Sequence, residues 1–133
     1  MIQRLESKHY LTNEDDGEEN YATQYVIPRE KLYDGTNHLF RGIEHGGVPL
    51  SFFWGHYSRP QGPKLHRHPY DEIHIVEEGR ATFTLGNEQI VVEGGHVVIT
   101  PRNTPHKFVN SGDETLKMIS IHCSEKIISE YLE

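Results

Sequence analysis

The chain has 133 residues and a mass of 15.4 kDa, which is the size of one compact domain and excludes a second large one. Its formal net charge is −7 with no cluster of Lys or Arg to offset it, which argues against nucleic acid as a main partner. Cys123 is the single cysteine, so no intrachain disulfide can form and a reducing compartment is favoured. No apolar run has the length of a signal peptide or a membrane span, so we expect a cytoplasmic protein without membrane contact.

The N-terminal part is polar and contains an acidic run. Five negative charges fall within six residues and predict a solvated loop, because the alternating ligands and distal Glu of an EF-hand calcium loop are missing. We interpret residues 1–45 as a polar arm of the same domain with two possible strands, Tyr21–Ile27 and His38–Glu44, and residues 46–133 as a barrel. The acidic run consists of Glu14, Asp15, Asp16, Glu18 and Glu19.

From residue 49 onward, short apolar segments alternate with Gly, Pro and Asn and predict strands joined by tight turns. Gly86-Asn87 is a good hairpin loop, since a type II′ turn prefers Gly at its first central position. Only the tail Glu125–Glu133 has a helical pattern. The architecture is therefore all-β, and closure into a barrel would remove exposed strand edges. The expected strands are Leu50–Tyr57, Lys64–His68, Ile73–Glu77, Arg80–Leu85, Gln89–Val92, His96–Thr100, Lys107–Asn110 and Leu116–His122.

Histidine is unusually frequent, with 10 copies, six of them between His56 and His106. His66 and His68 are two residues apart in an extended segment, so both imidazoles point to the same side. Glu72 follows a turn and starts the next strand beside them. Three such ligands suit iron, manganese, nickel, cobalt or zinc better than calcium. The alternative interpretation is a His-x-His pair that simply faces water.

The spacing resembles the two sequence motifs of the cupin superfamily, over about residues 50–123. In the first motif, Glu follows a His-x-His pair after three or four residues, and Gly follows after six more. In the second motif, Gly precedes Pro-x-Gly by five residues, and His and Asn come after it. The matching residues are His66, His68, Glu72 and Gly79 in the first motif and Gly95, Pro101, His106 and Asn110 in the second.

Two positions depart from these motifs. Pro60 stands where the first motif opens with Gly, and Gly62 is displaced toward the histidines. Asn103 replaces the inner Gly of the second motif. Because Asn tolerates a left-handed backbone better than other non-Gly residues, we expect that turn to survive.

The resemblance implies a double-stranded β-helix (jelly-roll) barrel of the cupin type, here with a short C-terminal helix. It also implies one divalent metal ion (Fe, Mn, Ni, Co or Zn) and a homodimer, because small cupins often pair their sheets. Four protein ligands would leave two positions of an octahedral ion for water, dioxygen or substrate. The implied ligands are His66, His68, Glu72 and His106.

Residues next to these ligands could take part in the chemistry. His74 shares the inward side of its strand with Glu72 and is our candidate acid/base or supporting residue. The alternative is a buried histidine that is hydrogen-bonded to a neighbour. In the last strand, Met118, Ser120 and His122 are candidates for the far side of the cavity.

An aromatic stripe precedes the motifs. Phe52, Trp54 and His56 share one side of their strand, and such a stripe packs in a core more often than it forms a substrate wall. His56 and Tyr57 lie on opposite sides, so at most one should enter the cavity.

Two classes of function fit these patterns. The first is a metal-dependent enzyme, such as a dioxygenase or isomerase, that acts on a small organic substrate. The second is a cupin that binds or senses a small ligand without turnover. A structural or storage protein with a vestigial site is a third reading, and the intact set of four ligands argues against it. Family membership alone does not select the reaction.

Overall fold

The computed structural model describes residues 25–133, which belong to two units, Met1–Tyr33 and Asp34–Glu133. In the described part of the first unit, a 3₁₀ helix, η1 (Arg29–Leu32), follows Pro28. The strand predicted over Tyr21–Ile27 is wrong where it is described: residues 25–27 are not in a strand, and Lys31 N–H donates to the Pro28 carbonyl (3.0 Å) to close a helical turn. Residues 21–24 and the acidic run lie outside the described residues.

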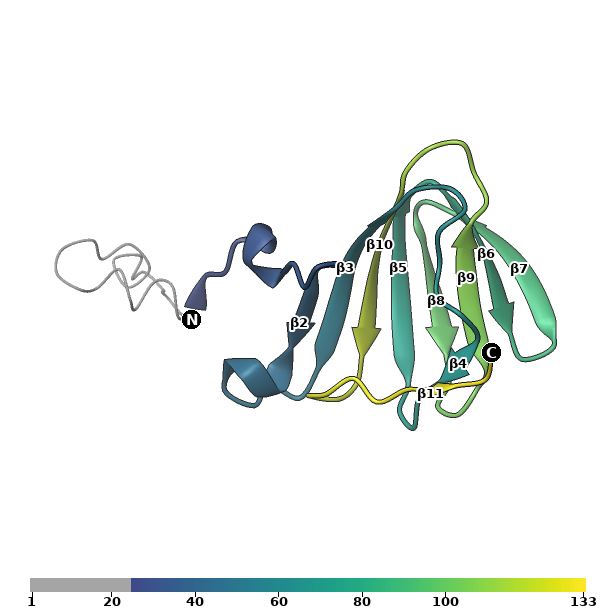
Figure 1. Ribbon diagram of the computed structural model, residues 1–133. Coiled ribbons are helices and arrows are strands. Elements are labelled where there is room, and N and C mark those ends of the chain that lie inside the picture. The colour runs from purple at the N-terminus through teal and green to yellow at the C-terminus, as the bar shows by residue number, and fades with distance from the viewer. Residues whose placement is uncertain (1–24) are drawn as a thin grey trace, which may run out of the picture. The chain divides into compact units, whose positions relative to one another are not determined.

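Residues 34–133 form two five-stranded sheets, and every strand pair is antiparallel (Figure 1). This arrangement confirms the all-β prediction. The first sheet, in spatial order, contains β2 (Leu39–Arg41), β3 (Ser51–Tyr57), β10 (Leu116–His122), β5 (Glu72–Glu78) and β8 (His96–Thr100). The second contains β11 (Glu130–Tyr131), β4 (His66–Arg67), β9 (His106–Asn110), β6 (Arg80–Leu85) and β7 (Glu88–Glu93).

The core lies between the two sheets because alternate side chains of each strand point inward. Leu116 and Met118 of β10 and Phe83 of β6 are all 0% exposed. Further along β10, Ser120 and His122 are also buried on the same side. Apolar residues therefore fill one half of the interior and polar residues the other. The apolar cluster consists of Val76, Ala81, Phe83, Val92, Val98, Phe108, Leu116 and Met118.

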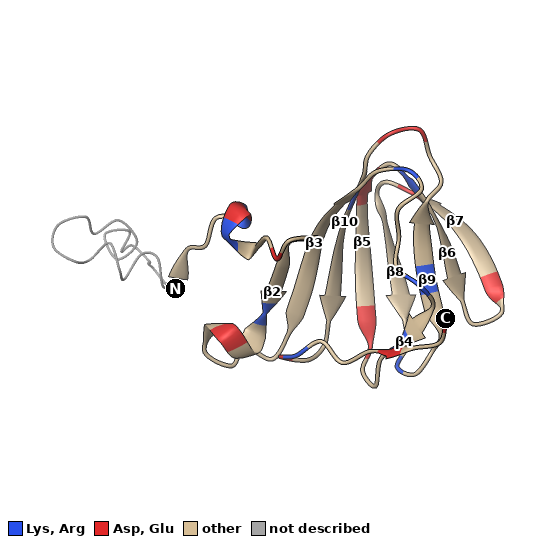
Figure 2. Cartoon of the chain, in the orientation of Figure 1, with Lys and Arg blue, Asp and Glu red and all other residues tan. Residues whose placement is uncertain are grey.

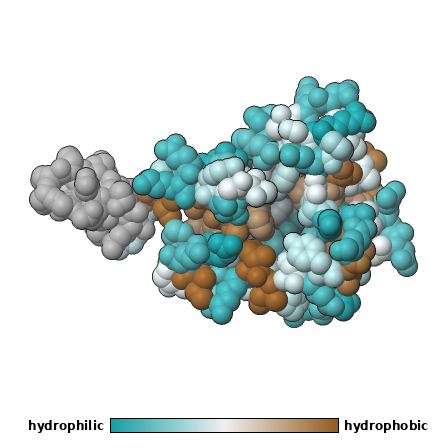
Figure 3. Space-filling model, in the orientation of Figure 1, coloured by the Kyte–Doolittle hydropathy of each residue, from teal (hydrophilic) through white to brown (hydrophobic). Residues whose placement is uncertain are grey.

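The aromatic stripe of β3 does not join this core, contrary to our interpretation. Ser51 and Gly55 are the buried positions of β3, so Phe52 and Trp54, one residue out of step, point away from the interior and are half-buried. Hydrophobic side chains also gather in patches on the molecular surface seen in Figure 3.

The hairpin between β6 and β7 has the turn that its sequence predicts. Leu85 pairs with Glu88 across the two-residue loop, and Gly86 has a φ of 61°. Asn87 is not among the described non-Gly residues with positive φ, so only the first central position is left-handed, as in a type II′ turn.

The strand predicted over His38–Glu44 is shorter than expected. After β2, the chain turns into a 3₁₀ helix, η2 (Gly42–His45). The Gly42 N–H donates to Ser51 Oγ (3.3 Å), and the Gly42 carbonyl accepts from Gly47 N–H (2.9 Å), so these groups hold the turn in place of a strand ladder.

The C-terminal tail is extended, and the helix predicted over Glu125–Glu133 is wrong. Strand β11 pairs with β4, which places Tyr131 opposite His66 and Glu130 opposite Arg67. The Arg67 Nε atom donates to Glu130 Oε1 (2.8 Å), and the Leu132 N–H donates to the Leu65 carbonyl (2.9 Å). These long-range contacts override the local helix propensity of the tail.

Replacement of Phe83 by Ala should lower the free energy of unfolding by about 3–5 kcal/mol, because it empties a fully buried aromatic site. Urea denaturation followed by circular dichroism would measure the change. Thr84→Ala is the matched control on the outward side of the same strand and should stay within about 1 kcal/mol of the wild type. A Phe83→Ala variant as stable as this control would contradict the assignment of the core.

Candidate metal centre

The structure brings together the four residues implied by the cupin motifs. Each of their side chains offers one ligand atom, and these atoms all lie within 4.8 Å of one another. His66 and His106 face each other across the β4–β9 ladder, Glu72 opens β5, and His68 follows β4. All four residues are 2–7% exposed, so the cluster is buried.

The backbone sets the tautomer of the three histidines. His66 Nδ1 lies 2.6 Å from the Lys64 carbonyl, and His106 Nδ1 lies 2.8 Å from the Thr104 carbonyl. His68 Nδ1 lies 2.8 Å from the carbonyl of Ile128. A carbonyl can only accept a hydrogen bond, so each Nδ1 carries the proton and each Nε2 presents a lone pair. This is the form in which histidine binds a metal ion.

These lone pairs converge on a carboxylate. Glu72 Oε1 lies 3.0 Å from His106 Nε2 and 3.2 Å from His68 Nε2. The His68 Nε2 atom is buried and has no hydrogen-bond partner among the described residues. Acceptor atoms that face one another without a donor are stabilised by a cation between them. The cluster could therefore hold a metal ion, and its three nitrogens and one oxygen suit a divalent transition metal.

The protonation states of the cluster support the same conclusion. Burial alone would raise the pKa of Glu72, but its contacts with the surrounding histidines, among them the Nε2–H of His122, outweigh it and bring the pKa below its usual range. Burial lowers the pKa of His66 to about 4, so its imidazole is neutral near neutral pH. The site thus combines an anionic carboxylate with a neutral ring, which are the states that metal ligands require.

His74 is a buried histidine bonded to its neighbours, as the alternative interpretation predicted. It is 1% exposed, and its ring nitrogens contact Ser120 Oγ (2.9 Å) and Thr100 Oγ1 (3.2 Å). Its Nε2 atom also lies 3.6 Å from Glu72 Oε2. Burial lowers the pKa of His74 to about 4, so the ring is neutral near neutral pH.

His122, which is hydrogen-bonded to Tyr70, contacts the second carboxylate oxygen of Glu72, Oε2. The Tyr70 hydroxyl accepts a hydrogen bond from Ile128 N–H (3.1 Å), so its own proton goes to His122 Nδ1 (2.8 Å). His122 then carries a proton on Nε2, which lies 3.1 Å from Glu72 Oε2. This series of hydrogen bonds engages Oε2 of Glu72, so Oε1 is the oxygen that faces the other candidate metal ligands. Burial raises the pKa of Tyr70 to about 12, which keeps the hydroxyl protonated.

Sequence reasoning found His122 and missed Tyr70. The alternation of β10 indicated His122 and Ser120 for the cavity, and both residues line it, whereas Met118 lies in the core. The sequence does not single out Tyr70, because its partners lie 52 and 58 residues away along the chain. No local spacing could have revealed these contacts.

The two departures from the cupin motifs leave the site intact. Asn103 has a φ of 65°, so it adopts the left-handed conformation that was expected of it. Gly62 passes so close to β9 that a Cβ atom there would collide with the Phe108 carbonyl. Gly62, displaced from the usual motif position at Pro60, therefore allows the loop to approach β9.

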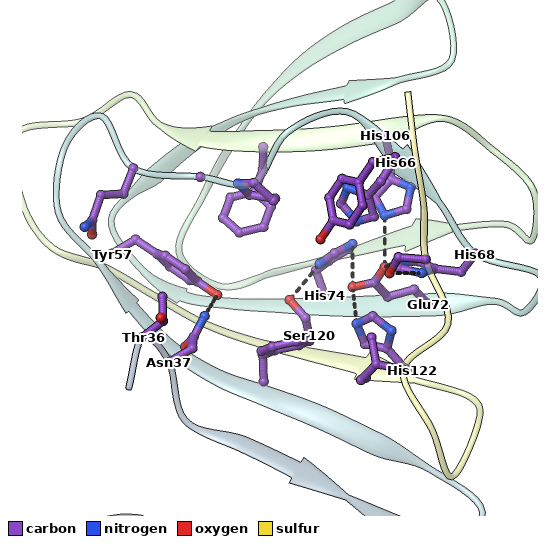
Figure 4. A pocket seen from close by; sticks show the side chains of 18 of the residues that line it. Thr36, Asn37, Tyr57, His66, His68, Glu72, His74, His106, Ser120 and His122 are labelled. Atoms are coloured by element: carbon purple, nitrogen blue, oxygen red, sulfur yellow. Dashed lines mark hydrogen bonds and ion pairs between the residues drawn. The ribbon is translucent and has the colours of Figure 1, made fainter. Parts of the chain in front are cut away.

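A cavity of about 440 Å³ adjoins the cluster. Figure 4 shows His66, His68, Glu72 and His106 at one side of it, while Tyr57, Asn37 and Thr36 lie at the other side. The prediction that at most one of His56 and Tyr57 enters the cavity is wrong: both line it, and His56 is exposed. The remaining lining residues are Asp34, Phe53, Gln61, Gly62, Pro63, His74, Phe108, Ser120, His122, Ile127, Ser129 and Tyr131.

Comparison with known proteins agrees with this fold and site. The family model described as "Cupin domain" matches residues 57–122. A curated protein of Methanocaldococcus jannaschii, the uncharacterized protein MJ1618, is 41% identical over 63 residues, which are 45% of this chain and 50% of the relative. The chain therefore spans about half the length of this relative.

Several solved structures share the fold. An uncharacterized double-stranded β-helix protein of Klebsiella pneumoniae has a TM-score of 0.64 and 17% identity, and the match covers 82% of this chain and 97% of that one. A variant of Bacillus subtilis oxalate decarboxylase has a TM-score of 0.66 and 17% identity, and the match covers 76% of this chain and 29% of that one. A recombinant oxalate oxidase in complex with glycolate has a TM-score of 0.57 and 20% identity, and the match covers 62% of this chain and 46% of that one.

The two antiparallel five-stranded sheets place the chain in the double-stranded β-helix fold class. The chain belongs to the cupin superfamily, and residues 57–122 are its cupin domain. Among the described residues, no helix has the length and apolar character needed to cross a bilayer.

Metal analysis should find close to one transition-metal ion per wild-type chain, and a His66→Ala/His106→Ala double variant should lose at least nine-tenths of it, because two of four ligands are gone. Inductively coupled plasma mass spectrometry on untagged protein would measure both. His96→Ala is the matched control, since His96 is exposed and lies outside the cluster. Equal metal content in all three proteins would contradict the assigned site.

Tyr70→Phe should weaken metal binding by about 10–100-fold, because it removes the hydroxyl that orients His122 and retains the ring that stacks on His68. It should also cost about 1–3 kcal/mol of unfolding free energy, since the Ile128 N–H loses its acceptor. Competition with a zinc chelator and urea denaturation would measure the two effects. Tyr131→Phe, at a residue that is 62% exposed, serves as control, and identical behaviour of both variants would refute the chain of hydrogen bonds.

Proposed function

We propose that this protein is a metal-dependent enzyme, a dioxygenase, isomerase or related catalyst, that acts on a small organic substrate. The observation that carries this proposal is the position of the cluster: three inward Nε2 lone pairs and one carboxylate oxygen border a cavity large enough for a small molecule. An ion held by His66, His68, Glu72 and His106 would keep open coordination positions, unlike an ion in a closed structural site.

A divalent Fe, Mn, Ni, Co or Zn ion in this site would supply Lewis acidity, and iron or manganese would add redox chemistry. The chain's own residues prepare the site for it. Glu72 contributes the negative charge, and His122 fixes its orientation through Oε2. Phe53 and Phe108 line the cavity with apolar surface, which excludes water and strengthens electrostatic interactions within it.

His74 is the proposed proton carrier. Both of its partners, Ser120 and Thr100, are hydroxyl groups, and a hydroxyl can donate or accept a hydrogen bond. The ring proton can therefore move between Nδ1 and Nε2 without the loss of a hydrogen bond. Its low pKa favours the neutral ring, which can accept a proton at Nε2 on the side of Glu72.

The cavity favours a substrate without a second carboxylate. No Lys or Arg occurs among the described residues that line it, and the charged side chains there are Asp34 and Glu72. A second carboxylate is stabilised best by a cationic side chain, and the described lining offers none. The substrate we propose has one metal-binding oxygen group and an uncharged body that packs on Phe53, Tyr57 and Phe108, which distinguishes it from the substrate named for the oxalate enzymes of the same fold.

A second candidate is a cupin that binds or senses such a ligand without turnover. It is favoured by the fact that both ring nitrogens of His74 already contact side-chain hydroxyls, which leaves this residue no ring nitrogen reserved for a substrate. In either case, the single cysteine, Cys123, fits a reducing compartment such as the cytoplasm.

The test uses the metal-loaded full chain and a panel of small hydroxy acids, keto acids, diphenols and sugars, with oxygen uptake and proton NMR as readouts. We expect turnover of a singly charged or uncharged compound, none of oxalate, and a loss of at least 100-fold in His74→Asn at unchanged metal content. Val91→Ala, at a residue outside the cavity lining, is the control variant. Saturable binding without turnover would select the sensing protein, and turnover of oxalate would overturn the substrate class.

A further inference from the structure

The end of the cavity that lies opposite the candidate metal site carries two neutral polar side chains. Figure 4 shows Tyr57 and Asn37 there, and the Asn37 Nδ2 atom donates a hydrogen bond to the Tyr57 oxygen (3.3 Å). We call these two residues the distal pair. The proposed reaction uses the ring of Tyr57 for packing and leaves both polar groups without a role.

The backbone fixes the orientation of the Asn37 amide. The His38 N–H donates to Asn37 Oδ1 (3.0 Å), and a backbone N–H can only donate, so the other amide atom is the nitrogen with its two donors. The Asn37 N–H donates to Asp34 Oδ1 (2.7 Å), and the Trp54 N–H donates to the His38 carbonyl (2.8 Å). These bonds hold the turn of Asn37 against β3, so the amide presents a donor to Tyr57.

The hydroxyl of Tyr57 therefore keeps its own proton for another partner. Its oxygen accepts from Asn37, and this hydroxyl has no second hydrogen-bond partner among residues 25–133. Burial raises the pKa of Tyr57, so the proton stays on the oxygen at neutral pH. A donor on a cavity wall that lacks an acceptor is a group that a ligand can satisfy.

Gly55 directs the Tyr57 hydroxyl into the cavity. The two residues share the inward side of β3, and a Cβ atom at Gly55 would collide with the Cζ atom and the hydroxyl oxygen of Tyr57. The φ of Gly55 is not positive, so this position requires a small residue for space and not for backbone conformation. The ring thus lies across Gly55, and Phe108 packs against it edge-on, with ring centroids 5.1 Å apart.

The strand register gives the distance between the two ends of the cavity. Glu72 lies opposite His122, which lies opposite Ser51, so Glu72 is level with Ser51 along β3. The Tyr57 hydroxyl lies over Gly55, four residues further along the strand, which corresponds to about 13 Å. A ligand that spans this gap loses about 2 Å to a metal–oxygen bond and about 3 Å to a hydrogen bond. Its two polar groups must therefore be about 8 Å apart.

The charges around the distal pair favour an uncharged ligand group. β3 carries no Lys, Arg, Asp or Glu over its whole length (Figure 2), and no Lys or Arg occurs among the described residues that line the cavity. Asp34, which is bonded to Asn37, also lines the cavity, and its carboxylate would repel an anionic group. An ammonium group has no lone pair, so it would leave the donors of Tyr57 and Asn37 unsatisfied. A neutral oxygen acceptor fits these donors.

We propose that the distal pair is a specificity site that binds a neutral oxygen acceptor, such as a carbonyl, at the end of the substrate remote from the metal. The Tyr57 hydroxyl donates to this oxygen, and Asn37 holds the hydroxyl in the donating orientation. The inference rests on the proposed function, because the other end of the ligand is held at the metal site. It narrows the substrate to a compound with a metal-binding oxygen group and a neutral acceptor oxygen about 8 Å away.

The test measures the binding of two acids to the zinc-loaded full chain by isothermal titration calorimetry. 4-Acetylbenzoate has a carboxylate for the metal end and a carbonyl at the far end. 4-Isopropylbenzoate has nearly the same shape and the same charge but no acceptor at the far end. The wild type should bind 4-acetylbenzoate about 5–10-fold more tightly, because only this acid accepts the Tyr57 proton.

Two variants separate hydrogen bonding from packing. Tyr57→Phe removes the hydroxyl alone and should bring the affinities for the two acids within about twofold of each other, with metal content and the affinity for 4-isopropylbenzoate unchanged. Asn37→Asp replaces the amide donor by a carboxylate that accepts the Tyr57 proton, so the preference should be lost although Tyr57 is present. Tyr33→Phe, at a residue outside the described cavity lining, is the matched control and should keep the preference.

Gly55→Ala tests the position of the hydroxyl. The added Cβ atom should displace the Tyr57 ring and reduce the preference for 4-acetylbenzoate to about twofold or less, with metal content unchanged. Circular dichroism checks that each variant folds. If Gly55→Ala does not fold, Tyr57→Phe and Asn37→Asp decide the question, because both keep the size of the side chain.

Equal affinity of the wild type for the two acids would overturn the specificity site and leave the proposed function standing, because the carboxylate end still binds. A preference that survives in Tyr57→Phe would also overturn it, since the acceptor would bind elsewhere. Equal loss of both acids in Tyr57→Phe would mean that this residue acts by packing alone. A wild type that binds neither acid at about 10 mM would overturn the inference, whereas turnover of another compound would still support the proposed function.

Discussion

The structure depends on one buried negative charge. An ionised carboxylate in a protein interior costs several kcal/mol unless partners compensate it, and Glu72 is 3% exposed. Four imidazoles surround it, from β5, β9, β10 and the segment after β4. The Nε2–H of His122 donates to it, and a cation among the Nε2 lone pairs of His66, His68 and His106 would complete the compensation. The positions of these elements are therefore coupled through Glu72, and the polar half of the interior is organised around this carboxylate.

The C-terminal tail belongs to the same arrangement. Both polar groups of the Ile128 peptide segment are in use: its N–H donates to Tyr70, and its carbonyl accepts from His68. Strand β11 then places Tyr131 against His66, with ring centroids 5.4 Å apart. A segment without any ligand residue thus orients His68 and packs against His66.

The ligands could be predicted from sequence because their geometry is local. A separation of two residues in a strand puts His66 and His68 on one side, and the motif spacing then identifies Glu72 and His106. The contacts of Tyr70 and the extended tail could not be predicted in this way, because they depend on pairing between segments far apart in the chain.

The error on the aromatic stripe has a different cause. Strands of the first sheet alternate polar and apolar residues, as in Glu72-Ile73-His74-Ile75, and the usual rule places the apolar set inside. Here the polar set points inward because the site lies there, so the apolar set points outward. The alternation of polar and apolar residues was evident from the sequence. Which of the two sets points inward depends on the polar site in the interior, which the alternation does not reveal.

Individual strands contribute residues both to the apolar core and to the candidate metal site. In β5, Glu72 and His74 face the site while Val76 packs in the core, and in β10, His122 faces the site while Met118 packs. Substitutions at one end of a strand therefore leave the other end in contact with its own neighbours. The reaction of such a barrel can diverge through ligand and cavity residues while its folding stability is maintained separately by the apolar end.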